Sequence, residues 1–202
     1  MRIGFDLDNT IFDYSEALEQ LVKEDFRFPR NQISKKDQVK SYLIEHFNED
    51  SWTEFQGKLY TSCFENVFVS PNTIQLLNDL SKQHEVHILS HKTKFPALGP
   101  RIDMRIGSMQ KLEELGLRVR LGSDSSTINV RFFDSSAEKI QVINSMNLDF
   151  FLDDLQSILE KITTAKTRAL FTSVQTDYEL PFLVFQNWLD VDSYLRRNYL
   201  EL

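Results

Sequence analysis

Acidic and hydroxyl side chains follow three short apolar segments of this sequence. Asp6 and Asp8 come after the first segment, Ser90 after the second, and the pair Asp153 and Asp154 after the third. The segments themselves are residues 1–5, 85–89 and 150–152. Short apolar runs are typical of buried strands, and ligands of parallel sheets bind where the strands end. We therefore expect these five polar residues to lie close together at one edge of a sheet.

Together with a lysine, side chains of these types can act on a phosphate monoester. Such esters are anionic and hydrolyse extremely slowly in water, so a catalyst must supply a nucleophile and neutralise the phosphoryl oxygens. A carboxylate can attack phosphorus to form an aspartyl phosphate, and Asp6 is the candidate. Magnesium prefers oxygen ligands, which Asp6 and Asp154 would provide. Ser90 and Lys139 would contact the phosphoryl oxygens, and Lys139 would also pair with Asp6.

Strand-like and helix-like segments alternate along most of the chain. Strands are expected at residues 1–5, 85–89, 128–133, 150–152 and 169–172, and helices near residues 70, 106, 136 and 187. Residues 14–69 instead carry only helical periodicity, which indicates a helical insertion. This order predicts an α/β fold with a doubly wound, mostly parallel, Rossmann-like sheet.

The order of the polar residues resembles the haloacid dehalogenase superfamily. Its first motif has the form Asp-x-Asp-x-Thr or Val, here Asp6 to Thr10, and it is followed by a Ser or Thr, a Lys, and an acidic pair after an apolar strand. All four motifs occur here in that order, and the resemblance spans Ile3 to about Leu195. It implies that residues 1–13 and 70–202 form a catalytic core and that residues 14–69 form a small helical cap.

The resemblance also implies roles for single residues. The backbone carbonyl of Asp8 would complete the magnesium site, Asp153 would lie in or beside that site, and Thr10 would steady the loop. The Asp8 carboxyl would protonate the leaving oxygen and later deprotonate water, which favours phosphate transfer, because dehalogenases generally lack an aspartate there. Lys139 matches the family lysine because it precedes the acidic pair by one helix and one strand. Lys111 is the alternative.

The residues after Ser90 depart from the family pattern. His91 stands where the family usually has a small or amide residue. With Lys92, Lys94 and Arg101 it forms a cation-rich segment. This segment either binds an anionic part of the substrate or is an ordinary solvated loop, and both alternatives stay open.

Composition narrows the class of protein. A formal net charge of −7 argues against tight nucleic-acid binding, and no segment approaches the roughly 20 apolar residues that span a bilayer. The single cysteine, Cys63, excludes an intramolecular disulfide and a Cys-rich zinc site. No leader-like pattern follows Met1. These features predict a cytoplasmic protein without a membrane or nucleic-acid partner, and they say nothing of its oligomeric state.

The sequence thus predicts a magnesium-dependent phosphomonoesterase that acts on a small phosphorylated metabolite such as a sugar phosphate. A nucleoside monophosphate phosphatase and a phosphomutase are the alternatives within the same chemistry. An alternative of another class is a phosphoacceptor or binding module without turnover, because receiver domains also combine acidic residues, a hydroxyl, a lysine and magnesium. Receiver domains, however, carry the phosphorylated aspartate on a later strand and need no helical insertion of this size.

Overall fold

The chain folds into two compact units. The computed structural model describes residues 1–28, 35–122, 127–172 and 179–200. The first unit, here called the core unit, and the second, here called the helical unit, both combine segments that are distant in sequence. The core unit consists of Met1–Ile11, Val69–Lys92 and Met109–Leu202, and the helical unit of Phe12–Phe68 and Thr93–Ser108.

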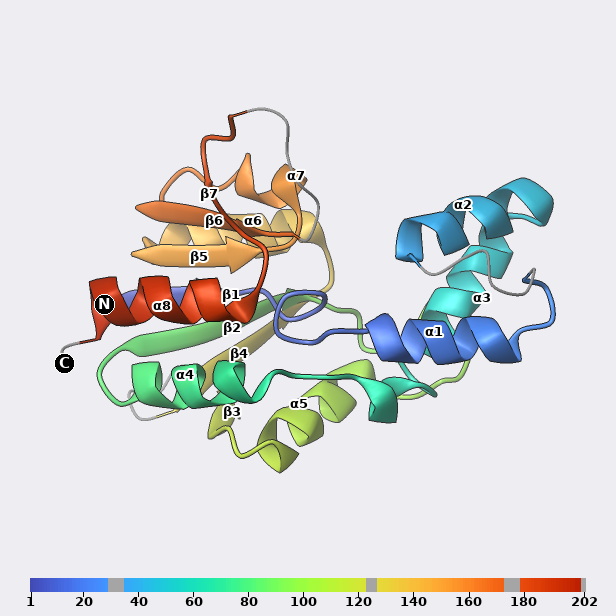
Figure 1. Ribbon diagram of the computed structural model, residues 1–202, viewed down its shortest axis with the longest axis horizontal. Coiled ribbons are helices and arrows are strands. Elements are labelled where there is room, and N and C mark those ends of the chain that lie inside the picture. The colour runs from blue at the N-terminus through green and yellow to red at the C-terminus, as the bar shows by residue number, and fades with distance from the viewer. Residues whose placement is uncertain (29–34, 123–126, 173–178, 201–202) are drawn as a thin grey trace. The chain divides into compact units, whose positions relative to one another are not determined.

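A parallel sheet forms the centre of the core unit (Figure 1). Among the described residues it has seven strands in the order β3-β4-β2-β1-β5-β6-β7, and every pairing is parallel. They are β1 (Arg2–Phe5), β2 (Glu85–His91), β3 (Val119–Leu121), β4 (Ile128–Phe133), β5 (Phe150–Asp153), β6 (Thr167–Phe171) and β7 (Leu183–Phe185). Because β1 lies between β2 and β5, the polar residues at the ends of all three strands come to one edge.

Helices accompany the sheet in the order expected for an α/β fold. They are α4 (Pro71–Ser81), α6 (Ser136–Met146), α7 (Gln156–Leu159) and α8 (Trp188–Tyr199), and α5 (Met104–Glu114) begins in the helical unit and ends in the core unit. None of the helices in the described part of the chain is long and apolar enough to cross a membrane.

Consecutive residues of β5 face opposite sides of the sheet, as extended backbone requires. The ring of Phe150 lies 5.9 Å from the ring of Tyr194 in α8. Phe151 instead belongs to a buried cluster with Ile143 of α6 and Ile158 of α7. Helices thus cover both faces, and the predicted doubly wound α/β architecture is confirmed.

Side-chain caps fix where two of these helices begin. The Ser135 hydroxyl accepts a hydrogen bond from the Glu138 N–H at 3.2 Å and caps α6. The Asn187 side chain accepts one from the Asp190 N–H at 3.0 Å and caps α8. Each cap stabilises its helix by about 1 kcal/mol. Their positions place Lys139 in the first turn of α6 and make the residue after Asn187 the first of α8.

The helical unit contains helices α1 (Ser15–Glu24), α2 (Lys36–His46) and α3 (Glu49–Leu59) and the 3-10 helix η1 (Phe64–Asn66). The predicted division assigns residues 93–108 to the core, whereas by compactness they group with these helices. Gly57 of α3 explains the grouping, because a Cβ atom there would lie only 1.9 Å from the Leu98 carbonyl oxygen. That the segment 14–69 acts as a cap stays a prediction.

Two short edge strands and several strand ends differ from the predicted elements. β3 and β7, at the two edges of the sheet, have three residues each and are not predicted, because so short a segment shows no period. β2 continues to His91, so Ser90 lies within the strand rather than after it.

Candidate active site

The loop after β1 holds Asp6 at its start and turns sharply behind it. The Asp6 N–H donates to the Leu152 carbonyl at 2.8 Å, so the hydrogen bonding between β1 and β5 continues as far as this residue. Asn9 has a φ of 60°, a left-handed conformation that asparagine adopts more readily than most residues. The Ile11 N–H closes the turn by donating to the Leu7 carbonyl at 2.9 Å. The backbone therefore fixes where the Asp6 side chain begins.

Helix α8 braces the same loop through Trp188. Its indole N–H donates to the Thr10 carbonyl at 2.9 Å in a buried hydrogen bond, and its ring lies 6.0 Å from that of Phe5 and 5.7 Å from that of Phe171. A buried indole N–H requires such an acceptor. Trp188 is absent from the predicted site, because a tryptophan at a helix start gives no sign of the distant loop it will reach.

Lys139 joins two buried carboxylates. Its Nζ lies 2.5 Å from Asp6 Oδ1 and 2.7 Å from Asp153 Oδ2. The three side chains are only 3%, 8% and 0% exposed, respectively. Asp6 Oδ2 accepts from the Thr10 hydroxyl at 3.5 Å, and Asp153 Oδ1 accepts from the Leu155 N–H at 2.8 Å. The structure thus contains the expected pairing of Lys139 with Asp6, and both oxygens of Asp153 are already engaged within the protein.

Burial and crowding of carboxylates shift protonation in this cluster. Burial raises the pKa of Asp6 well above its usual value; the Lys139 ammonium opposes the rise, and the carboxylates of Asp153, Asp154 and Asp8 add to it. Burial acts to lower the pKa of Lys139, but Asp6 and Asp153 outweigh burial and raise it. Lys139 therefore stays protonated, and further positive charge would help Asp6 to ionise.

Asp8 is held by two donors from the end of β2. Lys92 Nζ lies 2.8 Å from Asp8 Oδ1, and the Ser90 hydroxyl donates to Asp8 Oδ2 at 3.4 Å. The Lys92 N–H donates to the Phe133 carbonyl at 3.0 Å, so the backbone stays paired with β4 beyond the last residue of β2. Because side chains alternate along an extended chain, residues 90 and 92 point to the same side.

The cationic residues after Ser90 do not form one group. Lys92 is buried, with 4% of its surface exposed, whereas His91 is exposed. In the helical unit, Lys94 Nζ and the Arg101 guanidinium lie 5.4 and 4.7 Å from the ring centre of Phe95. Lys92 could have been identified from its position two residues after Ser90, because alternate residues of a strand share one face. The predicted strand ends before Ser90, so the prediction does not extend this alternation to Lys92.

The types of donor at this edge fit magnesium. Within the described residues, no three His, Cys, Asp or Glu side chains are grouped so that they could hold a metal by themselves. The expected site needs fewer: the carboxylates of Asp6 and Asp154 and the backbone carbonyl of Asp8, because magnesium keeps several waters. Asp154 is half-buried, and it is close enough to Asp6 to raise the pKa of Asp6. The side chains at this edge include more acidic groups than lysines, which suits a cation: Asp6, Asp8, Asp153 and Asp154 against Lys92 and Lys139.

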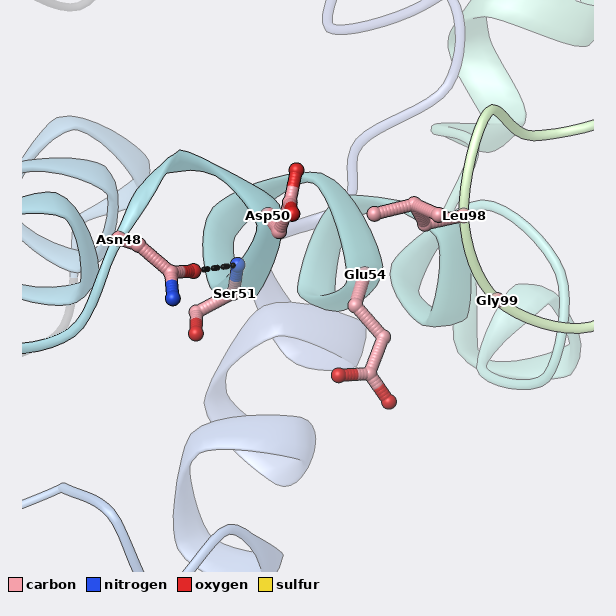
Figure 2. A pocket seen from close by; sticks show the side chains of 6 residues that line it. All are labelled: Asn48, Asp50, Ser51, Glu54, Leu98 and Gly99. Atoms are coloured by element: carbon pink, nitrogen blue, oxygen red, sulfur yellow. Dashed lines mark hydrogen bonds between the residues drawn. The ribbon is translucent and has the colours of Figure 1, made fainter.

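A pocket of about 410 Å³ lies wholly within the helical unit (Figure 2). It is lined by Asn48, Asp50, Ser51, Glu54, Leu98 and Gly99. The Asn48 side chain accepts from the Ser51 N–H at 2.8 Å, so this polar group already serves as the cap of α3 (Figure 2). None of the predicted catalytic residues lines the pocket.

Neither a protein-family model nor a curated protein matches this sequence. Solved structures nevertheless resemble it over nearly its full length. The HAD-hydrolase YfnB from Bacillus subtilis, whose structure contains bound magnesium, has a TM-score of 0.62 at 12% identity and covers 96% of this chain and 97% of its own. A haloacid dehalogenase-like family hydrolase from Streptococcus pneumoniae has a TM-score of 0.60 at 14% identity, with 96% and 97% coverage.

A third solved structure of similar fold is a dehalogenase. L-2-haloacid dehalogenase from Xanthobacter autotrophicus, with chloropropionic acid covalently bound, has a TM-score of 0.51 at 13% identity and covers 98% of both chains. At such identities, likeness shows a shared fold and leaves the reaction undecided. Because these structures match nearly the whole chain, the chain has the fold of the haloacid dehalogenase superfamily of hydrolases.

Proposed function

We propose that this chain is a magnesium-dependent phosphomonoesterase that works through an aspartyl phosphate on Asp6. The observation that carries the proposal is the paired arrangement of two carboxylates at the end of β1. Asp6 is held by Lys139, and Asp8, two residues later, is held by Ser90 and Lys92. One carboxylate can thus act as the nucleophile while the other transfers protons.

In the first step, Asp6 attacks phosphorus while the bond from phosphorus to the leaving oxygen breaks. Asp8 gives that oxygen a proton, so the product departs as an alcohol. In the second step, Asp8 takes a proton from the water that attacks phosphorus, while the bond from phosphorus to the Asp6 oxygen breaks. Inorganic phosphate leaves, and both carboxyl groups return to their starting forms.

Lys139 and Ser90 stabilise the charge on the phosphoryl oxygens during both steps. Lys139 also keeps Asp6 oriented, since the two atoms that pair lie 2.5 Å apart. Asp153 holds Lys139 from the other side and uses its second oxygen for the Leu155 N–H. We therefore assign Asp153 a supporting role behind Lys139 rather than a direct place in the metal site.

Magnesium would be held by the carboxylates of Asp6 and Asp154 and by the backbone carbonyl of Asp8. When bound, it neutralises charge on the phosphate and allows one anion to approach another. The surplus of carboxylates over lysines at this edge supports the assignment. The magnesium in the structure of YfnB is a further point in its favour.

Asp8 is the reason for preferring phosphate transfer over dehalogenation. A halide leaves without a proton, whereas the alkoxide of a phosphate ester is a poor leaving group unless it receives one. In the family that this chain resembles, the dehalogenases generally lack an aspartate at the corresponding place. The substrate we propose is a small phosphorylated metabolite such as a sugar phosphate, with the helical segment 14–69 selecting it as a cap.

A substrate screen of the full chain tests this function. Purified protein with magnesium would be given sugar phosphates, nucleoside monophosphates, p-nitrophenyl phosphate and 2-chloropropionate. Released phosphate, released chloride, the isomers of each sugar phosphate and the intact mass of the chain would be measured. We expect phosphate release that chelation abolishes and added magnesium restores. Chloride release alone would indicate a dehalogenase, and an isomerised sugar phosphate would indicate a mutase. A phosphorylated chain without turnover would indicate a phosphoacceptor module.

A further inference from the structure

We propose that Lys92 is a positioning residue, which holds the Asp8 carboxyl in the orientation needed for proton transfer. This inference rests on the proposed function, and it concerns a residue that the family motifs leave out. The family's lysine is matched by Lys139, which serves Asp6. Lys92 is a second buried lysine at the same edge, and it serves the other carboxylate.

The contacts of Asp8 show how its orientation is fixed. Lys92 Nζ binds Oδ1 at 2.8 Å, and the Ser90 hydroxyl binds Oδ2 at 3.4 Å, so each oxygen has a donor. Both donors come from one stretch of extended chain, which the bond from the Lys92 N–H to the Phe133 carbonyl anchors to β4. The carboxyl is therefore held against a rigid sheet edge rather than by a loop.

The burial of Lys92 indicates that this contact is a built feature. The side chains of Lys92 and Asp8 are 3% and 17% exposed. An ammonium group withdrawn from water is costly unless an anion lies beside it, and a lysine at the end of a strand can readily extend into solvent instead. The less buried partner, Asp8, is the one that must reach a leaving group.

Lys92 and Lys139 therefore have separate tasks. Lys139 lies between Asp6 and Asp153 and neutralises the nucleophile, whereas Lys92 contacts the proton-transfer group. Misplacing a catalytic group by about 1 Å can cost roughly a hundredfold in rate. Loss of Lys92 should thus impair those reactions that need a proton from Asp8 and spare those that do not.

Two aryl phosphates separate this role from direct phosphate binding. The phenolate leaving phenyl phosphate needs a proton, whereas p-nitrophenolate leaves well without one. The value of kcat/KM reports the first phosphoryl transfer for each ester. For Lys92→Met we expect kcat/KM to fall about 10- to 100-fold with phenyl phosphate and less than about threefold with p-nitrophenyl phosphate. The matched control is Lys82→Met, which removes an exposed lysine 2.9 Å from Asp79 and should change neither value.

A double-mutant cycle shows whether Lys92 acts through Asp8. In an Asp8→Ala background, Lys92→Met should lower kcat/KM for phenyl phosphate by less than about twofold, because the group it positions is gone. This double variant removes both charges of the Lys92–Asp8 pair, so it should fold even if Lys92→Met alone does not. Lys92→Arg, which keeps a cation, should restore part of the activity in the otherwise unmodified chain.

Equal losses for both esters, or independent effects of the two substitutions, would overturn the positioning role and make Lys92 a phosphate-binding residue. Unchanged kinetics in Lys92→Met would overturn it as well. If the unmodified chain hydrolyses neither ester and none of the phosphate esters in the substrate screen, the proposed function itself fails, and this inference falls with it.

Discussion

Replacing Lys139 with methionine should destabilise the fold far more than the loss of an ordinary lysine. The substitution keeps an unbranched side chain as far as the Cε position but leaves Asp6 and Asp153 without the cation that lies 2.5 and 2.7 Å away. All three side chains are at least nine-tenths buried. Removing one partner of a buried pair typically costs about 3–5 kcal/mol, because the remaining charge stays desolvated. We expect a loss of that size.

Lys166 provides the matched control. Its Nζ lies 2.6 Å from Asp149 Oδ1, nearly as close as Lys139 Nζ lies to Asp6, but its side chain is 75% exposed. Exposed pairs contribute about 0–1 kcal/mol, so Lys166→Met should cost no more than that. The free energy of unfolding of each variant would be measured in urea at neutral pH by circular dichroism.

A second substitution identifies the cause of the loss. Asp153→Asn keeps the oxygen that accepts from the Leu155 N–H but removes the charge. Asp153→Asn should destabilise the unmodified chain. It should be neutral or stabilising when Lys139 is already methionine, because it then removes a buried carboxylate that has lost the Lys139 cation. If Lys139→Met costs no more than Lys166→Met, or if Asp153→Asn costs the same in both backgrounds, the buried ion-pair cluster does not hold this edge together.

Three further predictions concern packing, pH and the metal. Gly57→Ala should lower the free energy of unfolding by about 1–3 kcal/mol, because its Cβ would meet the Leu98 carbonyl oxygen at 1.9 Å. In Gly107→Ala the new Cβ has its nearest neighbour at 3.9 Å, so this control should gain up to about 1 kcal/mol from helix propensity. Equal effects of the two substitutions would contradict the close approach at Gly57. Burial would raise the pKa of Asp25, but its hydrogen bonds with Arg27 outweigh burial and lower this pKa. The pair therefore stabilises the fold at pH values above the unperturbed pKa near 3.9 and ceases to do so as the pH falls through the lowered pKa. Asp25→Asn should therefore reduce the melting temperature at pH 7 and have little effect near about pH 2, and a constant difference would count against the pair. Asp154→Ala should raise sharply the magnesium concentration needed for half-maximal phosphate release, and unchanged metal dependence would remove Asp154 from the proposed ligands.

The edge that gathers the acidic residues could be predicted from sequence, because strand ends are a local signal. An apolar run followed by Asp6 or Asp153 marks both the strand and its end, and parallel strands share that edge. Lys139 could be placed by topology, one helix and one strand before the acidic pair. Its contact with Asp153 adds a link that the motif pattern does not contain.

Other parts of the site depend on packing that the sequence does not display. Lys92 stands in a run with His91 and Lys94 that is typical of solvated loops, and only continued pairing with β4 buries it. Likewise, the grouping of residues 93–108 with the helical unit depends on the absence of a side chain at Gly57. One missing Cβ atom in a helix gives no sign of which distant loop will use the space.

Covalent capture on Asp6 tests the proposed chemistry most directly. Asp8→Ala, given p-nitrophenyl phosphate and magnesium, should transfer the phosphoryl group to Asp6 and then lack the base that activates water. Intact-mass spectrometry after rapid acid quenching should show one added phosphoryl group, peptide mapping should place it on Asp6, and an Asp6→Asn, Asp8→Ala chain should stay unlabelled. An unlabelled Asp8→Ala chain that still releases phosphate, or a label on any other residue, would contradict the mechanism.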